Sequence, residues 1–486
     1  MAKATRRQFL QQTASAAAAL HAFPMRALAG NGKHFEAAPE IADRLDAAAV
    51  RKLASQVRGQ VISPAARDYE SSRLVFNRAF DRHPALIVRC AETGDIPRAL
   101  EFAQRQNLPL AVRGGGHSRA GFSVCDGGVV IDLSGMARVE VDADKRVARA
   151  ESGALVRDLD RASQRFGLAT TLGGCPTVGI AGLTLGGGEG QLMGKYGAAC
   201  DNLISAQIVA VDGRQVEASQ YSNPDLFWAI RGGGGNFGVV TALEYRLHPV
   251  GDVLAGTLMY SAGRVPELLE AYVKFVAAAP DEVSIVGGLL PSEQGTRFRM
   301  GFFYCGPPGQ GNELLKPLRA LKPEVDDVRV KPYQEAQEAG FLSSPVAHFQ
   351  TDLFLPELTA EAIATMATAT DNGPPNTRVF IVPFFGAVTR VGLSATSFAL
   401  RAPGYELDIV GLWNATAEKA AAVEWVKSLR DKLRPISRGV YVNQLGDTSE
   451  ELVRSAYGAN YARLAEIKRK FDPENVLRLN QNIKPA

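Results

Sequence analysis

Leu110-Ala111-Val112-Arg113-Gly114-Gly115-Gly116-His117-Ser118 is an apolar run that breaks into three glycines and ends with an imidazole and a hydroxyl. Consecutive glycines carry no Cβ atoms, so the backbone can turn sharply and lie against a flat or anionic ligand. His117 follows directly, where a ring nitrogen could reach whatever the loop holds. The stretch therefore predicts a ligand cradle with a reactive histidine at its end.

The residues before this loop predict a strand–helix–strand unit. Residues 84–88 are apolar and typical of a buried strand, and residues 95–105 place apolar side chains on one helical face. Residues 110–112 then form the next strand. The glycines fall at the end of that strand, where α/β sheets tend to bind ligands.

Two further glycine clusters follow, at residues 173–190 and 231–238. None of the three clusters clearly shows the G-x-G-x-x-G spacing of a dinucleotide fold at the start of a helix, and no G-K-[ST] Walker loop follows any of them. Clusters so far apart indicate an extended ligand that the backbone approaches repeatedly, and FAD has the natural size.

Beyond residue 254 or so the glycine clusters stop, and strand-like and helical stretches alternate to about residue 415, which is typical of a separate α/β domain. A helix is expected over residues 416–433. A final helix is expected over residues 450–471, before the chain ends in a polar tail.

Composition limits the class of partner. The chain has 486 residues, 46% of them hydrophobic, so it can bury the cores of two or three domains. The net charge of +3 is too small to indicate nucleic-acid or membrane binding through bulk electrostatics. A small-molecule partner is the better expectation.

The first residues are expected to direct export. Thr5-Arg6-Arg7-Gln8-Phe9-Leu10 resembles a twin-arginine signal, and Ala27-Leu28-Ala29 offers a cleavage site, so residues 1–29 are interpreted as a signal peptide. An ordinary secretory signal or an uncleaved anchor is the alternative. No later segment has the roughly 18 uninterrupted apolar residues of a membrane span. The expected location is periplasmic or secreted, with the twin-arginine machinery as partner and no membrane contact after cleavage.

Taken together and in order, several segments resemble the berberine-bridge-enzyme-like FAD-linked oxidases. The likeness covers residues 45–485, with a weakly marked middle domain. The segments that carry it are Arg113–Ser118, Cys175–Gly179, Leu185–Gly188, Tyr196-Gly197 with Asp201–Leu203, Asp225–Gly238, Tyr457–Tyr461, Asp472-Pro473 and Asn480-Gln481.

This resemblance implies an α+β fold. A PCMH-type FAD-binding domain of two subdomains, as in vanillyl-alcohol oxidase, is expected over residues 45–250. An inserted α/β substrate domain with an antiparallel sheet is expected over residues 251–430, and residues 431–486 are expected to return to the FAD domain.

The resemblance also implies two covalent bonds to the flavin. His117 would bond the 8α carbon and Cys175 would bond C6, since a neutral imidazole and a thiolate are suitable nucleophiles toward the quinone-methide tautomer. Pairing of the remaining cysteines, Cys90, Cys125, Cys200 and Cys305, stays open. No metal site is expected. The residues expected to contact FAD are Arg113, Gly114, Gly115, Gly116, His117, Ser118, Gly174, Cys175, Thr177, Val178, Gly179, Gly182, Gly187, Gly188, Gly238, Val240, Asn443 and Gln481.

Tyr441 is the expected catalytic residue, because Tyr441-Val442-Asn443 matches a Y-x-N segment on the substrate side of the flavin in the family. A phenol of pKa ≈ 10 needs a neighbouring charge or hydrogen bond to act as a base near neutral pH. Asp352, His348 and Asp408 are unranked candidates for that partner.

Two further positions bear on reactivity. Val178 corresponds to the position that gates dioxygen access in the family, and a small valine favours an oxidase. Leu183 stands where many members have a histidine near flavin N1, and a leucine side chain cannot hydrogen-bond there.

The expected activity is hydride transfer from a substrate C–H to flavin N5, with reoxidation by dioxygen to H₂O₂. The substrate would be an alcohol, a sugar or an amine. A flavin dehydrogenase with another acceptor and a non-catalytic flavin-binding protein are the alternatives.

Overall fold

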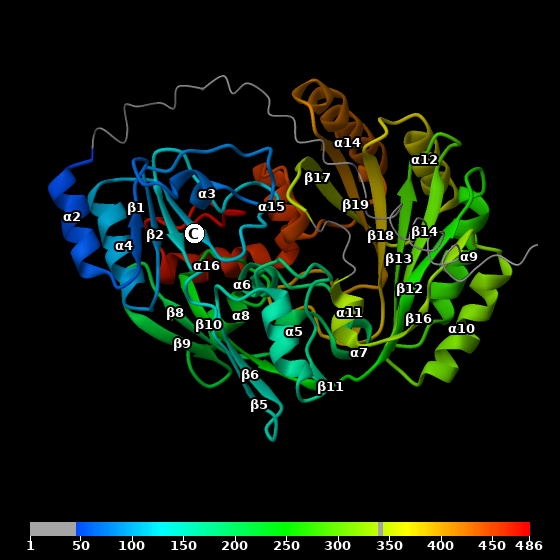
Figure 1. Ribbon diagram of the computed structural model, residues 1–486, viewed down its shortest axis with the longest axis horizontal. Helices are drawn as coiled ribbons and strands as arrows, with labels where there is room; N and C mark the ends of the chain where they lie inside the picture. Colours follow the sequence, from blue (N-terminus) through cyan, green and yellow to red (C-terminus); the bar gives the residue numbers. More distant parts are fainter. Residues whose placement is uncertain (1–44, 339–343) are drawn as a thin grey trace, which may run out of the picture. The chain divides into compact units, whose positions relative to one another are not determined.

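The computed structural model describes residues 45–338 and 344–486 (Figure 1). The predicted signal peptide, residues 1–29, lies outside the described residues. The described chain combines helices with one partly parallel sheet and several antiparallel sheets, which confirms the predicted α+β class.

The first sheet has the strand order β1-β2-β4-β3. Strands β2, β4 and β3 run parallel, and β1 is antiparallel to β2. The predicted strand–helix–strand unit is present, with β4 inserted between its two strands. Ile96, Ala99 and Leu100 of the helix are buried in the core. The elements are α2 (Ala47–Gln56), β1 (Gln60–Ile62), α3 (Tyr69–Arg73), β2 (Leu86–Arg89), α4 (Asp95–Arg105), β3 (Leu110–Arg113) and β4 (Val129–Asp132).

The second sheet is antiparallel, with the order β5-β6-β10-β8-β9. Strands β11 and β7, from the same part of the chain, form a separate antiparallel pair. Both later glycine clusters belong to this part of the chain. Its elements are β5 (Val139–Asp142), β6 (Val147–Glu151), α5 (Val156–Gln164), β7 (Leu168–Ala169), α6 (Ile180–Leu185), α7 (Met193–Tyr196), η2 (Ala199–Asp201), β8 (Leu203–Val209), β9 (Gln215–Ser219), α8 (Pro224–Ala229), β10 (Val239–Arg246) and β11 (His248–Pro249).

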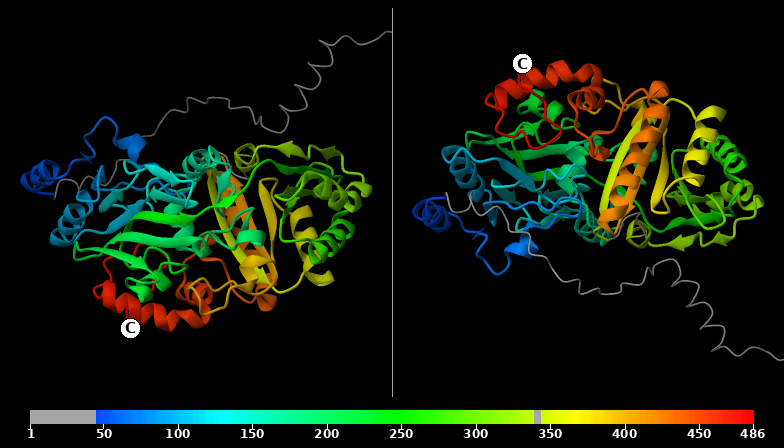
Figure 2. Two further views of the ribbon diagram at one scale, coloured as in Figure 1. Left: turned by 90° about the horizontal axis from the view of Figure 1, so that it is seen from below. Right: turned by 90° about the horizontal axis from the view of Figure 1, so that it is seen from above.

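A large antiparallel sheet follows, ordered β15-β12-β14-β13-β18-β19-β17, with β16 also paired to β12. Helices α12 and α14 lie side by side on one face of it (Figure 2). The elements are β12 (Val253–Tyr260), α9 (Val265–Ala278), β13 (Val283–Leu290), β14 (Arg297–Tyr304), α10 (Pro308–Ala320), β15 (Val325–Asp326), β16 (Arg329–Lys331), α11 (Tyr333–Glu338), β17 (Ala347–Leu355), α12 (Ala360–Asp371), β18 (Thr377–Phe384), α13 (Ala387–Arg390), β19 (Gly404–Trp413), η3 (Thr416–Glu418) and α14 (Lys419–Leu433).

The C-terminal segment packs against the third glycine cluster. The fully buried Lys468 ammonium contacts Asp472 Oδ2 at 2.6 Å and donates to the backbone oxygen of Asn236 at 2.8 Å. The single helix predicted over residues 450–471 is wrong: the chain breaks at Gly458, whose φ of 50° is left-handed. The elements are η4 (Arg434–Ile436), η5 (Val442–Gln444), α15 (Glu450–Tyr457), η6 (Gly458–Asn460) and α16 (Tyr461–Phe471).

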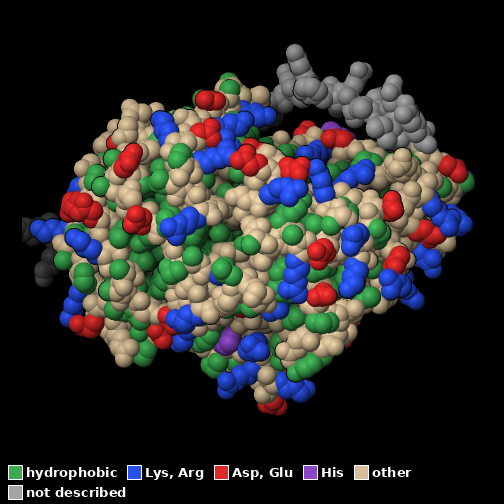
Figure 3. All heavy atoms as spheres, turned by 180° about the vertical axis from the view of Figure 1, so that it is seen from behind, with side chains coloured by type: hydrophobic (Ala, Val, Ile, Leu, Met, Phe, Trp, Pro, Cys, Tyr) green, Lys and Arg blue, Asp and Glu red, His purple; other side chains and the backbone are tan. Residues whose placement is uncertain are grey.

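Charged side chains of both signs are interspersed over the face drawn in Figure 3. Within residues 45–338 and 344–486, helices long and apolar enough to cross a membrane are absent.

Candidate active site

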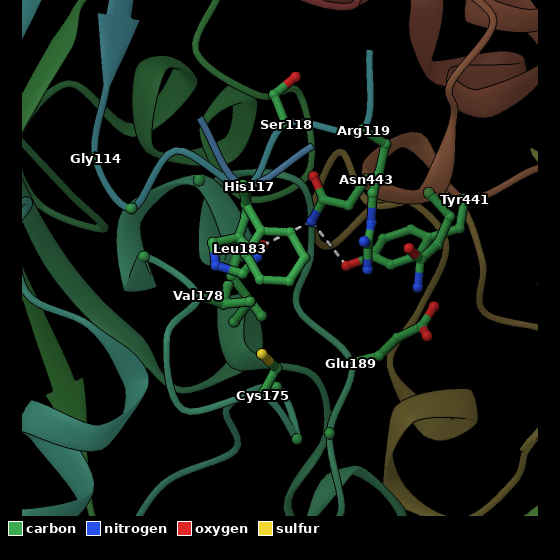
Figure 4. A pocket seen from close by; sticks show the side chains of 18 of the residues that line it. Gly114, His117, Ser118, Arg119, Cys175, Val178, Leu183, Glu189, Tyr441 and Asn443 are labelled. Carbon is green, nitrogen blue, oxygen red and sulfur yellow. Dashed lines mark hydrogen bonds between the residues drawn. The ribbon is translucent and has the colours of Figure 1, made fainter. Parts of the chain in front are cut away.

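A cavity of about 490 Å³ lies between the glycine clusters and one face of the large sheet. Its walls come from residues 114–118, 173–193 and 234–240, from strands β12, β13, β14, β18 and β19, and from the C-terminal stretches 441–444 and 477–481. Segments far apart in sequence thus meet around one space. Figure 4 shows His117, Val178 and Cys175 in one part of it, with Tyr441 and Glu189 across from them.

The glycines shape one side of this cavity. A Cβ atom added at Gly174, Gly182 or Gly235 would meet no atom within 4 Å, so a side chain at any of these lining positions would extend into open space. Gly115 and Gly179 instead press backbone to backbone, since a Cβ on Gly115 would lie 2.2 Å from the nitrogen of Gly179. These observations fit an extended flat ligand lying on bare backbone.

His117 is held by two neighbours. Its ring stacks on Phe76 with centroids 3.9 Å apart, and its Nε2 lies 3.1 Å from Thr177 Oγ1. Burial, with smaller contributions from Arg119 and His348, lowers the pKa of His117 to about 3. The imidazole is therefore neutral at physiological pH, which is the form that can act as a nucleophile.

Cys175 lies close to the same hydroxyl, with its Sγ 3.5 Å from Thr177 Oγ1. The Thr177 hydroxyl thus stands between the two residues predicted to bond the flavin. The other four cysteines, like Cys175, form no disulfide in the structure, and all five lie within the described residues. The sequence left open whether Cys90, Cys125, Cys200 and Cys305 form disulfides with one another, and in the structure they do not.

Most of the predicted cofactor residues line the cavity. They are Gly114, Gly115, Gly116, His117, Ser118, Gly174, Cys175, Val178, Gly179, Gly182, Gly238, Val240, Asn443 and Gln481.

The remaining four predicted contacts, Arg113, Thr177, Gly187 and Gly188, are not among its lining residues. Arg113 turns away to form a buried ion pair with Asp132 at 2.9 Å, and Thr177 bridges His117 and Cys175 from behind. These side chains support the loops that line the cavity.

Leu183 lines the cavity, and its backbone oxygen accepts a hydrogen bond from the Asn443 amide at 3.0 Å. This hydrogen bond links helix α6 to the C-terminal segment, and because it uses the backbone oxygen it does not depend on the side chain at position 183.

Tyr441 is fully enclosed beside the same segment. Its hydroxyl oxygen accepts hydrogen bonds from the Gly188 N–H at 2.9 Å and from the Asn443 amide at 2.8 Å. These bonds favour the phenolate, but burial and the Glu189 carboxyl raise the pKa of Tyr441 well above its ordinary value. The phenol therefore stays protonated near neutral pH. A phenolate base needs a neighbouring positive charge, whereas the group beside this hydroxyl is the Glu189 carboxyl.

Charged side chains of both signs line the rest of the cavity: Glu189, Asp327, Asp408, Arg119, Arg299 and Lys331. Of the carboxyl groups in and behind this lining, the sequence interpretation missed Glu189 and Glu406. Asp408 lines the cavity, and burial raises its pKa to about 7, opposed by Arg119 and assisted by Glu406. Burial likewise raises the pKa of Glu189, Glu406 and Asp352. The alternation Glu406-Leu407-Asp408 within an otherwise apolar strand was the sequence signal for two acids on one face.

The three candidate partners of Tyr441 lie at different depths. Asp352 Oδ2 accepts a hydrogen bond from the Tyr441 backbone N–H, while Asp408 faces the cavity and accepts from Gln350 at 3.1 Å. His348 lies behind, near Arg119, and burial lowers its pKa to about 3, so it is a weak base. Asp408 is thus the group that combines access with a suitable pKa. The described residues contain no cluster of His, Cys, Asp and Glu suited to a metal ion.

Comparison with known proteins agrees with this geometry. The family described as "FAD binding domain" matches residues 84–219, and the family "Berberine and berberine like" matches residues 440–484. The FAD-linked oxidoreductase YgaK of Bacillus subtilis (strain 168) is 31% identical over 444 residues, which cover 89% of this chain and 98% of YgaK. The chain belongs to the berberine-bridge-enzyme-like FAD-linked oxidoreductases. Its cofactor is therefore FAD.

The similarity to other members of this oxidoreductase family extends over nearly their whole length. (R)-6-hydroxynicotine oxidase of Paenarthrobacter nicotinovorans is 29% identical over 89% of this chain and 99% of its own. The crystal structure of 6-hydroxy-D-nicotine oxidase from Arthrobacter nicotinovorans superposes with a TM-score of 0.81 at 28% identity, covering 88% of this chain and 98% of that one. Berberine bridge enzyme itself, at 22% identity and a TM-score of 0.82, shares the fold.

Proposed function

We propose that this oxidoreductase is an FAD-dependent oxidase whose flavin is bonded both to His117 and to Cys175. The observation that carries the proposal is their placement: both line the glycine cradle, and one hydroxyl, Thr177 Oγ1, lies 3.1 Å from the His117 nitrogen and 3.5 Å from the Cys175 sulfur. Two nucleophiles held together beside bare backbone suit two bonds to one flat ring system.

FAD would supply the redox chemistry, by accepting a hydride at N5 and passing the electrons to dioxygen, which yields H₂O₂. The protein binds the substrate and removes the accompanying proton. Asp408 is the proposed base, because it faces the cavity and its pKa of about 7 leaves it ionised at slightly alkaline pH. Tyr441 then acts as a hydrogen-bonding group that holds Gly188 and Asn443 in place.

Val178 supports dioxygen as the acceptor, since its small side chain lines the cavity beside Cys175 (Figure 4). The name of the relative 6-hydroxynicotine oxidase supports the same choice. A dehydrogenase that uses another acceptor is the second candidate.

Denaturation tests the covalent attachment. Acid-precipitated protein should keep its yellow colour in the pellet, and peptide mass spectrometry should find flavin on both residues. The variants His117→Ala and Cys175→Ala should each keep one bond, and only the double variant should release the flavin. Full release from His117→Ala would refute the second bond. Reduction by dithionite followed by air should produce H₂O₂ faster than free FAD does.

We also propose export by the twin-arginine route with a periplasmic or secreted location. Cys90, Cys125 and Cys200 are buried and form no disulfide, which supports this proposal because a chain folded in a reducing compartment before export keeps such thiols reduced. Replacement of Arg6 and Arg7 by Lys should leave the protein in the cytoplasmic fraction, and unchanged fractionation would count against this route.

A further inference from the structure

One row of residues crosses the large sheet on the face that lines the cavity. Arg299 on β14 lies opposite Gly288 on β13, which in turn lies opposite Phe380 on β18. Phe380 lies opposite Asp408 on β19. Side chains directly opposite one another point to the same face of a sheet, and Arg299, Phe380 and Asp408 all line the cavity. The row therefore carries a cation at one end and the proposed base at the other.

The length of this row follows from the strand order. Three strand spacings, β14 to β13, β13 to β18 and β18 to β19, separate Arg299 from Asp408. At about 4.8 Å for each spacing, the two backbones are about 14 Å apart. The surface between them is apolar, because Val286, Val382 and Phe380 line the cavity there. A ligand that touches both ends must therefore be elongated, with an uncharged body.

The guanidinium of Arg299 is fixed at its end of the row. Its Nη2 donates a hydrogen bond to Thr257 Oγ1 on β12 at 2.9 Å. A Cβ atom added at Gly301 would lie 3.0 Å from Nη1, so the guanidinium lies over this glycine. Thr257 and Gly301 are opposite one another on β12 and β14, and both line the cavity. The neutral Thr257 hydroxyl thus orients the planar fork, on the side remote from Asp408, without neutralising its charge.

This side of the cavity carries a positive charge balance. Lys331 on β16 lines it as well, opposite Val253 of β12, so this ammonium adds to the positive potential. Asp327 is the acid that lines this side, and it accepts a hydrogen bond from the Thr257 backbone N–H. Asp327 is exposed, so solvent screens its charge. Burial lowers the pKa of Arg299, which indicates that water is partly excluded from the guanidinium, although it stays charged.

A carboxylate is the group that fits this cation best. The planar fork of an arginine can donate two parallel hydrogen bonds to a carboxylate, and the pairing is strong where water is partly excluded. The flavin diphosphate is a poorer candidate because the glycine stretches that suit the cofactor, such as residues 114–118, lie in the FAD-binding domain, whereas Arg299 lies on the sheet of the substrate domain.

We propose that the substrate is an elongated organic acid, whose carboxylate is bound by Arg299 and whose reacting end lies at Asp408, over the ring of Phe380. The proposal rests on the proposed oxidase function, because that function places the chemistry beside Asp408. Arg299 is then a specificity-determining residue that contacts the substrate far from the reacting bond. Binding at this remote point would fix the distance and direction in which the reacting end is presented to the base.

Probes with a phenyl ring on the same straight chain test this assignment: phenylhexanoate, phenylhexanol and phenylhexylamine. Calorimetric titration into the flavin-loaded, oxidised enzyme measures each affinity. Phenylhexanoate should bind at least about tenfold more tightly than the other two, because only its carboxylate pairs with the fork. Phenylhexanoate should also shift the flavin absorbance, whereas phenylacetate bound at Arg299 is too short to reach the flavin. Equal affinities of acid and alcohol, tighter binding of the amine, or equal flavin shifts from both acids would overturn the proposal.

Variants locate the carboxylate site. Arg299→Gln should weaken phenylhexanoate about tenfold or more and leave phenylhexanol unchanged. Arg299→Lys keeps the charge but loses the fork, and should weaken phenylhexanoate about threefold. Arg329→Gln is the matched control and should change neither probe, since Arg329 pairs with Glu335 and is not among the lining residues. Undiminished binding by Arg299→Gln, or an equal loss for acid and alcohol as a structural role would produce, refutes the proposal.

Flavin content separates the substrate from the cofactor as the anion that Arg299 binds. Arg299→Gln should retain its full flavin content, and loss of flavin would assign the cation to the cofactor diphosphate and overturn the proposal. Air reoxidation of the dithionite-reduced enzyme, measured without any probe, reports separately on the oxidase function.

Discussion

The two walls of the cavity are built in opposite ways. The cofactor wall consists of short contiguous stretches, residues 114–118 and 174–182, in which glycine backbone forms much of the surface that faces the cavity. The substrate wall consists of single side chains from separate strands, such as Asp408 and Phe380, that meet through sheet register. A motif can therefore identify the cofactor, whereas the chemistry of the substrate depends on pairing between distant strands.

Removing the proposed base tests whether the substrate wall acts independently of the cofactor wall. Asp408→Asn should lower the rate of flavin reduction about a hundredfold or more, because the substrate proton loses its acceptor. Flavin content and covalent attachment should not change. Stopped-flow reduction with a substrate that bleaches the flavin of the unchanged enzyme measures the rate, and Asp252→Asn on the surface serves as control. A normal rate would remove Asp408 from the mechanism.

Filling the cradle should have the converse effect. Gly182→Val places a branched side chain in the space where a Cβ now meets nothing within 4 Å, so most of the protein should be produced without flavin. Gly251→Val is the matched control, since Gly251 is also uncrowded but does not line the cavity. The ratio of the absorbance of flavin, at about 450 nm, to that of protein, at about 280 nm, measures the flavin bound per chain. Normal loading of Gly182→Val would contradict the cradle.

Tyr441→Phe separates the two candidate bases. Losing the hydroxyl leaves the Gly188 N–H and the Asn443 amide without their acceptor, and we expect about a tenfold slower flavin reduction with flavin retained. The variant should retain the acidic limb of the pH profile. A loss as large as that of Asp408→Asn would instead make the phenol the base.

The pH profile gives the smallest and most specific effect. Burial raises the pKa of Asp408 to about 7, so below that pH the carboxyl is protonated and cannot accept a proton. The limiting rate of flavin reduction should therefore rise about tenfold per pH unit on the acidic side and level off above pH 7 or so. A profile that rises only near pH 10 would point to Tyr441.

Much of the cofactor side followed from local sequence. Residues 95–105 form the predicted helix α4, and residues 110–112 lie in strand β3 as expected, because apolar periodicity decides such elements. The helix predicted over 450–471 was wrong, since Gly458 takes a left-handed conformation that periodicity does not reveal.

By itself, the sequence determined the presence of a glycine cradle with His117 at its end and of Cys175 in a second glycine cluster far along the chain, because backbone shape and nucleophile identity are local properties. Only the tertiary structure decided that Thr177 stands between those two residues, that Asp408 faces the cavity while His348 lies behind it, and that the group next to Tyr441 is a carboxyl. Charge and pKa depend on burial and on neighbours from other strands, and those are set only when the sheets assemble.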